Sequence, residues 1–175
     1  MSDRFNGTWT IDLDVSVVWD GTLKRHVKDE VGQEIITLRV SEGVQDYEVL
    51  YGDRPRIRMG YTARYDDSEW VQYSVREVLS TSQDAHYEMT QFKQRIKAIG
   101  GDRERSFNVG ESYGVVRLVW VDEMTHYRVS RSPQDGRAQS IMLRRMAEDG
   151  RSYLATVLDV QGIVYRIRKF VRLAY

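Results

Sequence analysis

The chain contains no cysteine, and among its 175 residues it has only two prolines. The lack of cysteine excludes disulfides, thiolate nucleophiles and thiolate metal sites, and the scarcity of proline leaves long strands uninterrupted. No stretch approaches the roughly 20 apolar residues that a membrane-spanning helix needs, and the start, MSDRFNG, lacks the apolar segment of a signal peptide. We therefore expect a cytoplasmic protein without a membrane partner.

A net charge is also missing, because 26 lysines and arginines balance 26 aspartates and glutamates. A balanced chain has no overall electrostatic attraction for nucleic acid, so we expect no nucleic-acid partner. Hydrophobic residues make up 41% and charged residues 30% of the sequence, which is typical of a globular protein. The length predicts a single domain over residues 1–175.

The clearest feature that is present is an alternation of apolar and polar residues near the start. Six apolar residues fall on one side of an extended chain: Trp9, Ile11, Leu13, Val15, Val17 and Trp19. This period of two predicts a strand with one buried face, and Asp20-Gly21 predicts a hairpin after it. Similar segments recur at roughly 8 to 12 residue spacing to the end of the chain, as in sandwiches and barrels.

The short connections favour neighbouring antiparallel strands, and joining the first strand to the last would remove both exposed edges. We therefore predict an all-β, antiparallel, up-and-down meander β-barrel of about 8–10 strands. A sandwich and a mixed α+β fold stay open as alternatives. One short helix is expected from Asp84 to Ile99, where apolar residues recur every three or four positions; a strand from Tyr87 to Phe92 is the alternative.

The two ends of the chain resemble a known group of proteins. NGTW followed by TIDLDV at the start, and VYRIRKFVRLAY at the end, resemble the calycin superfamily of lipocalins, fatty-acid-binding proteins and nitrobindin-like proteins. The resemblance implies a lipocalin-like barrel in which Gly7 and Trp9 close one end. It also implies that an arginine of the last strand packs over Trp9, with Arg166, Arg168 and Arg172 as the candidates. We do not expect the haem site of the nitrobindin-like proteins here, because it needs a histidine near the C-terminus and this chain has no histidine after His126.

A barrel of this size can enclose one small ligand. The alternation places apolar side chains with several hydroxyl groups on the inner face, a lining that suits a small hydrophobic or aromatic molecule. We predict binding of such a ligand, with the alternative that these side chains simply fill the core. The predicted ligand-binding residues are Tyr47, Tyr51, Met59, Tyr61, Tyr65, Tyr73, Tyr127 and Tyr165.

Some charged residues interrupt the apolar faces, among them Arg25, Arg117, Glu77 and Lys169. Glu77 lies between Val75 and Leu79, and Lys169 lies among apolar neighbours of the last strand. A carboxyl group in an apolar pocket has a raised pKa and can act as an acid or a base. The alternative function is therefore a cofactor-free isomerase, cyclase or hydratase in the same cavity. The competing interpretation places both residues near strand ends, in solvent.

The three histidines, His26, His86 and His126, have no metal-ligand spacing, so we expect no metal and no cofactor. The alternation puts His126 on the outer face, opposite Tyr127. An apolar outer patch would favour pairing with another protein or with a second copy in a homodimer. The candidates for that patch are Trp70, Trp120 and Phe170.

Overall fold

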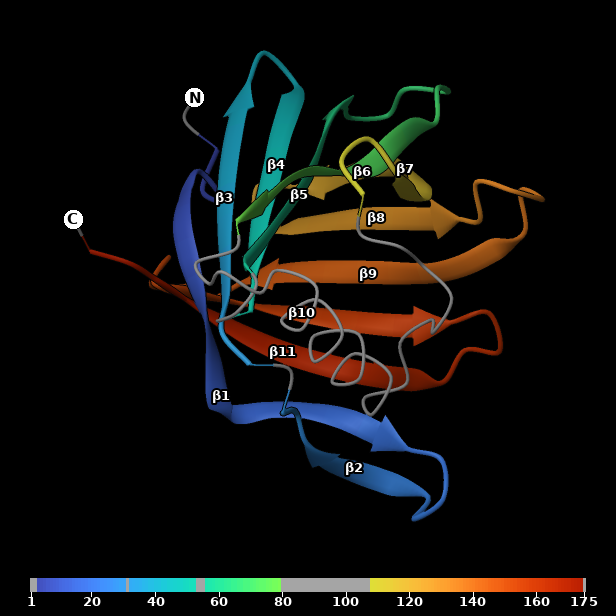
Figure 1. Ribbon diagram of the computed structural model, residues 1–175. Helices are drawn as coiled ribbons and strands as arrows, with labels where there is room; N and C mark the ends of the chain where they lie inside the picture. The colour runs from blue at the N-terminus through green and yellow to red at the C-terminus, as the bar shows by residue number, and fades with distance from the viewer. Residues whose placement is uncertain (1–2, 31, 53–55, 80–107, 175) are drawn as a thin grey trace.

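The computed structural model describes residues 3–30, 32–52, 56–79 and 108–174, so the predicted helix over Asp84 to Ile99 lies outside the described residues. The described part of the chain consists of strands joined by turns (Figure 1). The strands are β1 (Gly7–Asp20), β2 (Arg25–Lys28), β3 (Glu34–Ser41), β4 (Val44–Tyr51), β5 (Arg56–Arg64), β6 (Val71–Leu79), β7 (Ser112–Asp122), β8 (Thr125–Arg131), β9 (Ala138–Met146), β10 (Ser152–Asp159) and β11 (Val164–Arg172).

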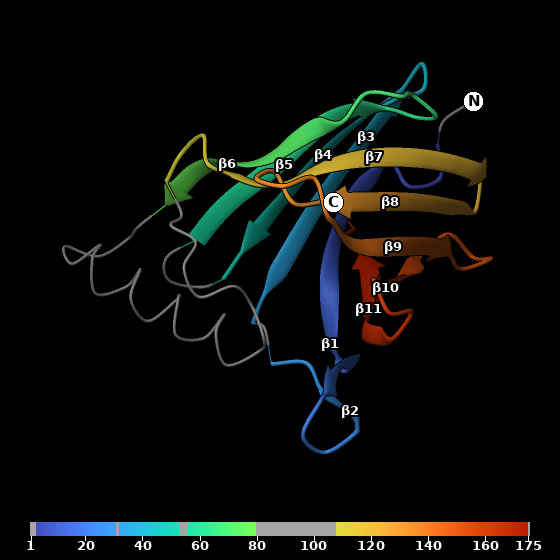
Figure 2. The same cartoon turned by 90° about the vertical axis from the view of Figure 1, so that its right-hand side faces the viewer.

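The strands form a closed barrel. From β3 to β11 each strand pairs with the next one in the chain, β3 also pairs with β1, and β11 pairs back to β1. β2 pairs only with the end of β1 and lies outside the ring, so ten of the eleven described strands close it. Figures 1 and 2 show β2 and the end of β1 projecting away from the rest of the barrel. The predicted antiparallel up-and-down barrel is confirmed.

A β-bulge divides β1 into two halves that face differently. Trp9 and Ile11 point into the core, but Val15 is 52% exposed and Ser16 is fully buried. The register between β1 and β11 shifts between Asp12 and Val17, where four residues of β1 face one residue of β11. An odd number of extra residues reverses the inward and outward sides of a strand. The prediction that one face runs from Trp9 to Val15 therefore holds as far as Leu13, which packs against the core, and is wrong from Val15 onward.

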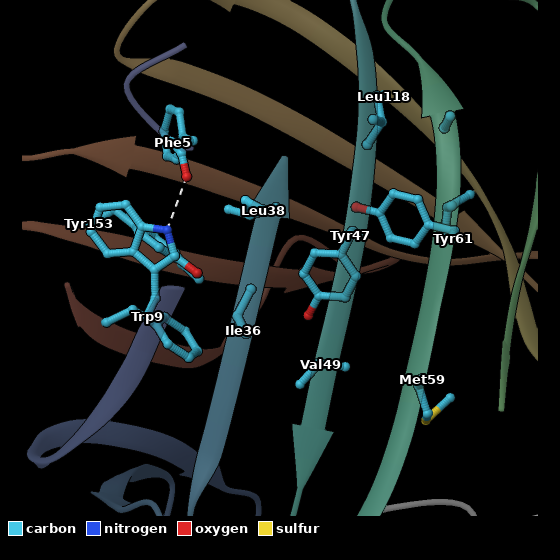
Figure 3. Packing of buried hydrophobic residues seen from close by; sticks show 14 of the residues in the cluster. Phe5, Trp9, Ile36, Leu38, Tyr47, Val49, Met59, Tyr61, Leu118 and Tyr153 are labelled. Carbon is cyan, nitrogen blue, oxygen red and sulfur yellow. Dashed lines mark hydrogen bonds between the residues drawn. The ribbon is translucent and has the colours of Figure 1, made fainter. Parts of the chain in front are cut away.

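One end of the barrel is closed by aromatic residues around Trp9. The indole Nε1 donates a hydrogen bond to the backbone oxygen of Phe5 (2.9 Å), and the ring meets Tyr153 edge-on with centroids 4.9 Å apart (Figure 3). Trp9, Phe5 and Tyr153 are each at most 1% exposed. Trp9 is therefore held in a buried aromatic cluster at this end of the barrel.

Arg172 is the arginine that packs over Trp9, as one of the three candidates implied by the resemblance. Its guanidinium carbon lies 4.1 Å from the centre of the indole ring, and its nitrogens donate to the backbone oxygens of Asn6 (2.6 Å) and Arg4 (2.8 Å). Gly7 has a φ of +143°, and a Cβ there would lie 2.5 Å from Nη1 of Arg172. The Gly-x-Trp motif thus keeps space open for this guanidinium.

Candidate functional site

A largely enclosed cavity of about 50 Å³ lies inside the barrel. A water molecule needs roughly 10 to 15 Å³ of such space, whereas pockets for drug-sized ligands span about 300 to 1,000 Å³. The cavity therefore suits a compact molecule or one functional group of a larger molecule. Its wall combines aromatic, aliphatic and charged side chains: Glu34, Ile36, Tyr47, Tyr51, Arg128, Met142, Arg144, Tyr153, Ala155, Val157, Arg166, Arg168 and Phe170.

Arg168 lies at the centre of a buried ion triad. Its Nε donates to Asp29 Oδ2 (2.7 Å) and its Nη1 to Glu34 Oε2 (2.5 Å). All three side chains are at most 6% exposed. The triad ties β11 to the start of β3 and to the segment after β2. The remaining nitrogen, Nη2, is buried and has no hydrogen-bond partner among the described residues.

Two further arginines that line the cavity have buried nitrogens without an acceptor. Nε of Arg166, and Nε and Nη1 of Arg128, are buried, and the described part of the chain offers none of them a hydrogen-bond partner. The guanidinium of Arg128 lies 5.4 to 5.9 Å from the ring centres of Tyr47, Tyr61 and Tyr73. Cation–π contacts of this kind stabilise its charge but leave its N–H groups unused.

Burial lowers the pKa of Arg166, and the neighbouring charge of Arg168 lowers it further. A guanidinium nevertheless keeps its proton in proteins, because its pKa starts so high. A buried lysine can lose its proton and so avoid the free-energy cost of burying a charge, but Arg166 cannot. The positive charge at this wall is therefore permanent.

Arg144, the fourth arginine of the wall, has acceptors for both terminal nitrogens. Nη1 donates to Gln45 Oε1 (3.0 Å) and Nη2 to Tyr61 Oη (3.2 Å). The Tyr61 hydroxyl donates to the same Gln45 oxygen (3.0 Å). Because a guanidinium can only donate, this contact fixes which end of the Gln45 amide is the oxygen. Its amide nitrogen must then donate to Tyr65 Oη.

The same chain of hydrogen bonds sets the proton position on His126. The Tyr65 hydroxyl already accepts from Gln45, so it donates to Nδ1 of His126 (2.7 Å). The imidazole proton therefore lies on Nε2, which faces Asp3 Oδ2 at 3.7 Å. Burial, and then the charge of Arg144, lower the pKa of His126 to about 3. His126 is 1% exposed, so the prediction that it faces outward is wrong.

Six of the predicted ligand-binding residues belong to the barrel interior. Tyr47 and Tyr51 line the cavity, and Met59, Tyr61, Tyr65 and Tyr73 pack in the core beside it. The rings of Tyr47 and Tyr61 stack with centroids 4.9 Å apart (Figure 3), and the hydroxyls of Tyr51 and Tyr73 are 3.1 Å apart. Burial raises the pKa of Tyr47, Tyr51 and Tyr73. These hydroxyls are therefore neutral groups that can donate hydrogen bonds.

The other two predicted tyrosines do not face the cavity. Tyr127 alternates with the inward-facing His126 and Arg128 and pairs with Val119 and Leu143 on the outer face. Tyr165 is the residue skipped where the β10–β11 register shifts, so it lies at a bulge. Phe170, predicted to lie outside, is 2% exposed and lines the cavity. The errors at Tyr127 and Phe170 share one cause, because the inward faces of β8 and β11 are the ones that carry the arginines.

The barrel-closing role predicted for Arg166 and Arg168 is wrong for the same reason, since both point into the cavity. The two weak catalytic candidates lie outside the barrel. Glu77 is 44% exposed and its Oε2 lies 3.0 Å from Nη1 of Arg58. Lys169 is 37% exposed, with Nζ 3.5 Å from Asp12 Oδ2. The β5–β6 register skips Arg76, between the pairs Arg58–Glu77 and Met59–Val75, so Glu77 turns outward.

The four inward arginines are the part of the site that the sequence analysis missed. A signal was present: Arg166, Arg168 and Phe170 are spaced by two, as are Met142 and Arg144. This spacing places the arginines on the same face as a large apolar residue. The apolar neighbours of Lys169 on the last strand, Ile167 and Val171, lie on the opposite face.

No protein-family model matches this chain, and neither a curated protein nor a solved structure matches it. Among residues 3–30, 32–52, 56–79 and 108–174, no three histidine or acidic side chains are grouped so that they could hold a metal ion. Across the same ranges, no helix has the length and apolar character needed to cross a membrane.

Proposed function

We propose that this protein binds a small molecule inside its barrel, in contact with the aromatic wall of the cavity. The observation that carries the proposal is the wall itself, which combines buried aromatic rings with buried polar nitrogens that lack partners in the described structure. Nearly all buried polar groups in folded proteins have a hydrogen-bond partner. A protein selected only for a stable core would place apolar side chains at these positions.

The chemistry of the wall favours a compact ligand with an aromatic or other apolar part. The rings of Tyr47, Tyr51 and Phe170 border the cavity, and aromatic rings pack favourably against flat apolar groups. The catalytic alternative receives no such support, because Glu77 and Lys169 lie outside. Membership of the calycin superfamily is part of the same proposal, supported by the closed barrel and by the arrangement of Gly7, Trp9 and Arg172.

Native mass spectrometry of the purified protein, before and after denaturing extraction, tests this function. A bound small molecule would appear as an added mass that denaturation releases. Ala155→Phe should prevent its binding, because Ala155 is buried and lines the cavity. Leu154→Phe is the matched control, since Leu154 is the next residue on β10 and is 46% exposed.

We expect the added mass in the wild type and in Leu154→Phe, and its loss in Ala155→Phe. The larger side chain can itself destabilise a packed core, so Ala155→Leu serves as a milder second variant. Equal occupancy in Ala155→Phe, Ala155→Leu and the wild type would place the ligand elsewhere and contradict the proposal.

A further inference from the structure

We propose that the ligand of this cavity carries a carboxylate, and that Arg128, Arg166 and Arg168 bind that group. The inference rests on the proposed function, because it concerns the chemistry of the molecule bound at the same site. It depends on the charge balance, the unpaired nitrogens and the size of the cavity.

The charge balance of the interior is positive. Four arginines line the cavity, namely Arg128, Arg144, Arg166 and Arg168. The carboxylates that form ion pairs with them in the described structure are Glu34 and Asp29, and both bind Arg168. The buried carboxyl of Asp3 also interacts with the charge of Arg144 and adds at most one further negative charge. Four positive and at most three negative groups leave the interior with a net positive charge. Burying uncompensated charge is costly, and an anionic ligand would remove much of that cost.

The unpaired nitrogens show where the anion would lie. Arg128 Nε and Nη1, Arg166 Nε and Arg168 Nη2 are buried, lack partners among the residues that the structure describes, and belong to side chains of one cavity wall. A carboxylate has two oxygens with about four lone-pair positions, so it offers as many acceptor positions as there are unpaired nitrogens. Hydrogen bonds between two charged groups are about twice as strong as neutral ones.

The other groups around the cavity are compatible with an anion. Glu34 and Asp29 are already bound by Nε and Nη1 of Arg168, and Arg144 is held by Gln45 and Tyr61. The hydroxyls of Tyr51 and Tyr73 are neutral donors beside Arg128. The volume of about 50 Å³ favours a carboxylate over a bulkier phosphate ester, and the aromatic wall favours an apolar group attached to it.

The first experiment is calorimetric titration with three acids of increasing size, namely acetate, benzoate and 2-naphthoate, and with their neutral amides. We expect at least one acid to bind and its amide to bind roughly tenfold more weakly or not at all, because an amide offers fewer lone pairs and no charge. Preference for acetate would indicate a free small acid. Preference for benzoate or 2-naphthoate would indicate the acid group of a larger aromatic molecule.

The variants Arg128→Met and Arg166→Met should each weaken acid binding roughly tenfold or more, since each removes a charge-assisted hydrogen bond. Arg145→Met is the control, because Arg145 is exposed on the outer face of β9. Arg166→Met should also raise the melting temperature of the ligand-free protein, because it removes an unpaired buried charge. A purely structural arginine would show the opposite change in melting temperature.

The outcomes separate the two proposals. Equal binding of an acid and its amide would overturn the carboxylate and leave the proposed function standing. If none of the three acids binds and the mass spectrum shows a neutral co-purified molecule, the carboxylate is again overturned and the proposed function stands. Failure of every acid and amide, with no co-purified mass, would overturn both. Unchanged acid affinity in Arg128→Met and Arg166→Met would also overturn the assignment to these residues.

Discussion

Two pairs of arginines in the barrel differ in one respect, namely whether their N–H donors meet acceptors. Arg172 donates to backbone oxygens and covers Trp9, and Arg144 donates to Gln45 and Tyr61. Arg128 and Arg166 reach the cavity with buried nitrogens that no described residue accepts. The hydrogen bonds of the first pair account for these arginines as part of the fold. Buried N–H groups without acceptors, as in the second pair, indicate that a binding partner is missing.

Arg168 has two nitrogens bound to carboxylates and one nitrogen without an acceptor. Its removal should have the largest effect on stability. Arg168→Met would leave Asp29 and Glu34 buried, charged and without their cation. Removing one member of a buried ion group typically costs about 3 to 5 kcal/mol. We expect a loss of that size in urea denaturation, with Arg145→Met unchanged within about 0.5 kcal/mol. Equal stability of the two variants would show that the triad does not hold the barrel.

The pH dependence of stability tests the hydrogen-bond chain at the Trp9 end. The pKa of His126 is about 3 in the folded protein and about 6.5 in an unfolded chain. The unfolded state therefore binds more protons between these values, and stability falls as the pH falls. From pH 6 to pH 4 this single group should remove about 2.5 kcal/mol.

The measurement for His126 is a series of urea denaturation curves between pH 4 and pH 6. His126→Gln keeps an acceptor for Tyr65 but does not titrate, so its stability should fall less steeply than that of the wild type. The raised pKa of Asp3, caused by burial, acts in the opposite direction and is common to both proteins. Parallel curves for the two proteins would show that His126 titrates normally.

Gly7→Ala should have a smaller effect, which depends on Arg172. A side chain at Gly7 meets both an unfavourable φ and the guanidinium of Arg172, and we expect a loss of about 1 to 3 kcal/mol. In an Arg172→Met background the steric part disappears, so the same substitution should cost measurably less. Fully additive losses in a double-mutant cycle would mean that Gly7 does not make room for Arg172.

Much of the barrel could be predicted from the sequence, because strands β3 to β5 alternate without interruption. Tyr47 and Met59, predicted to line the interior, are each 2% exposed. The pairing of β1 with β11 also followed from the need to remove exposed edges. The short helix expected from Asp84 to Ile99 stays a prediction, since it lies outside the described residues.

The interior charge could not be predicted by the same method, for two physical reasons. Bulges near Ser16, Glu77 and Tyr165 reverse the alternation, and the sequence alone does not mark where they lie. In β8 and β11, moreover, the inward residues include arginines while the outward residues include Val129 and Ile167. A rule that places apolar residues inside must fail where an interior holds charge for a ligand.

The most direct test of the central claim is a ¹H–¹⁵N correlation spectrum of the arginine Nε–H groups, recorded as the tightest-binding acid is added. We predict that the Nε–H signals of Arg128 and Arg166 move as they gain an acceptor. The Arg168 Nε–H signal should stay in place, because Asp29 already binds it. Arg128 and Arg166 signals that do not move at saturating acid would contradict the account.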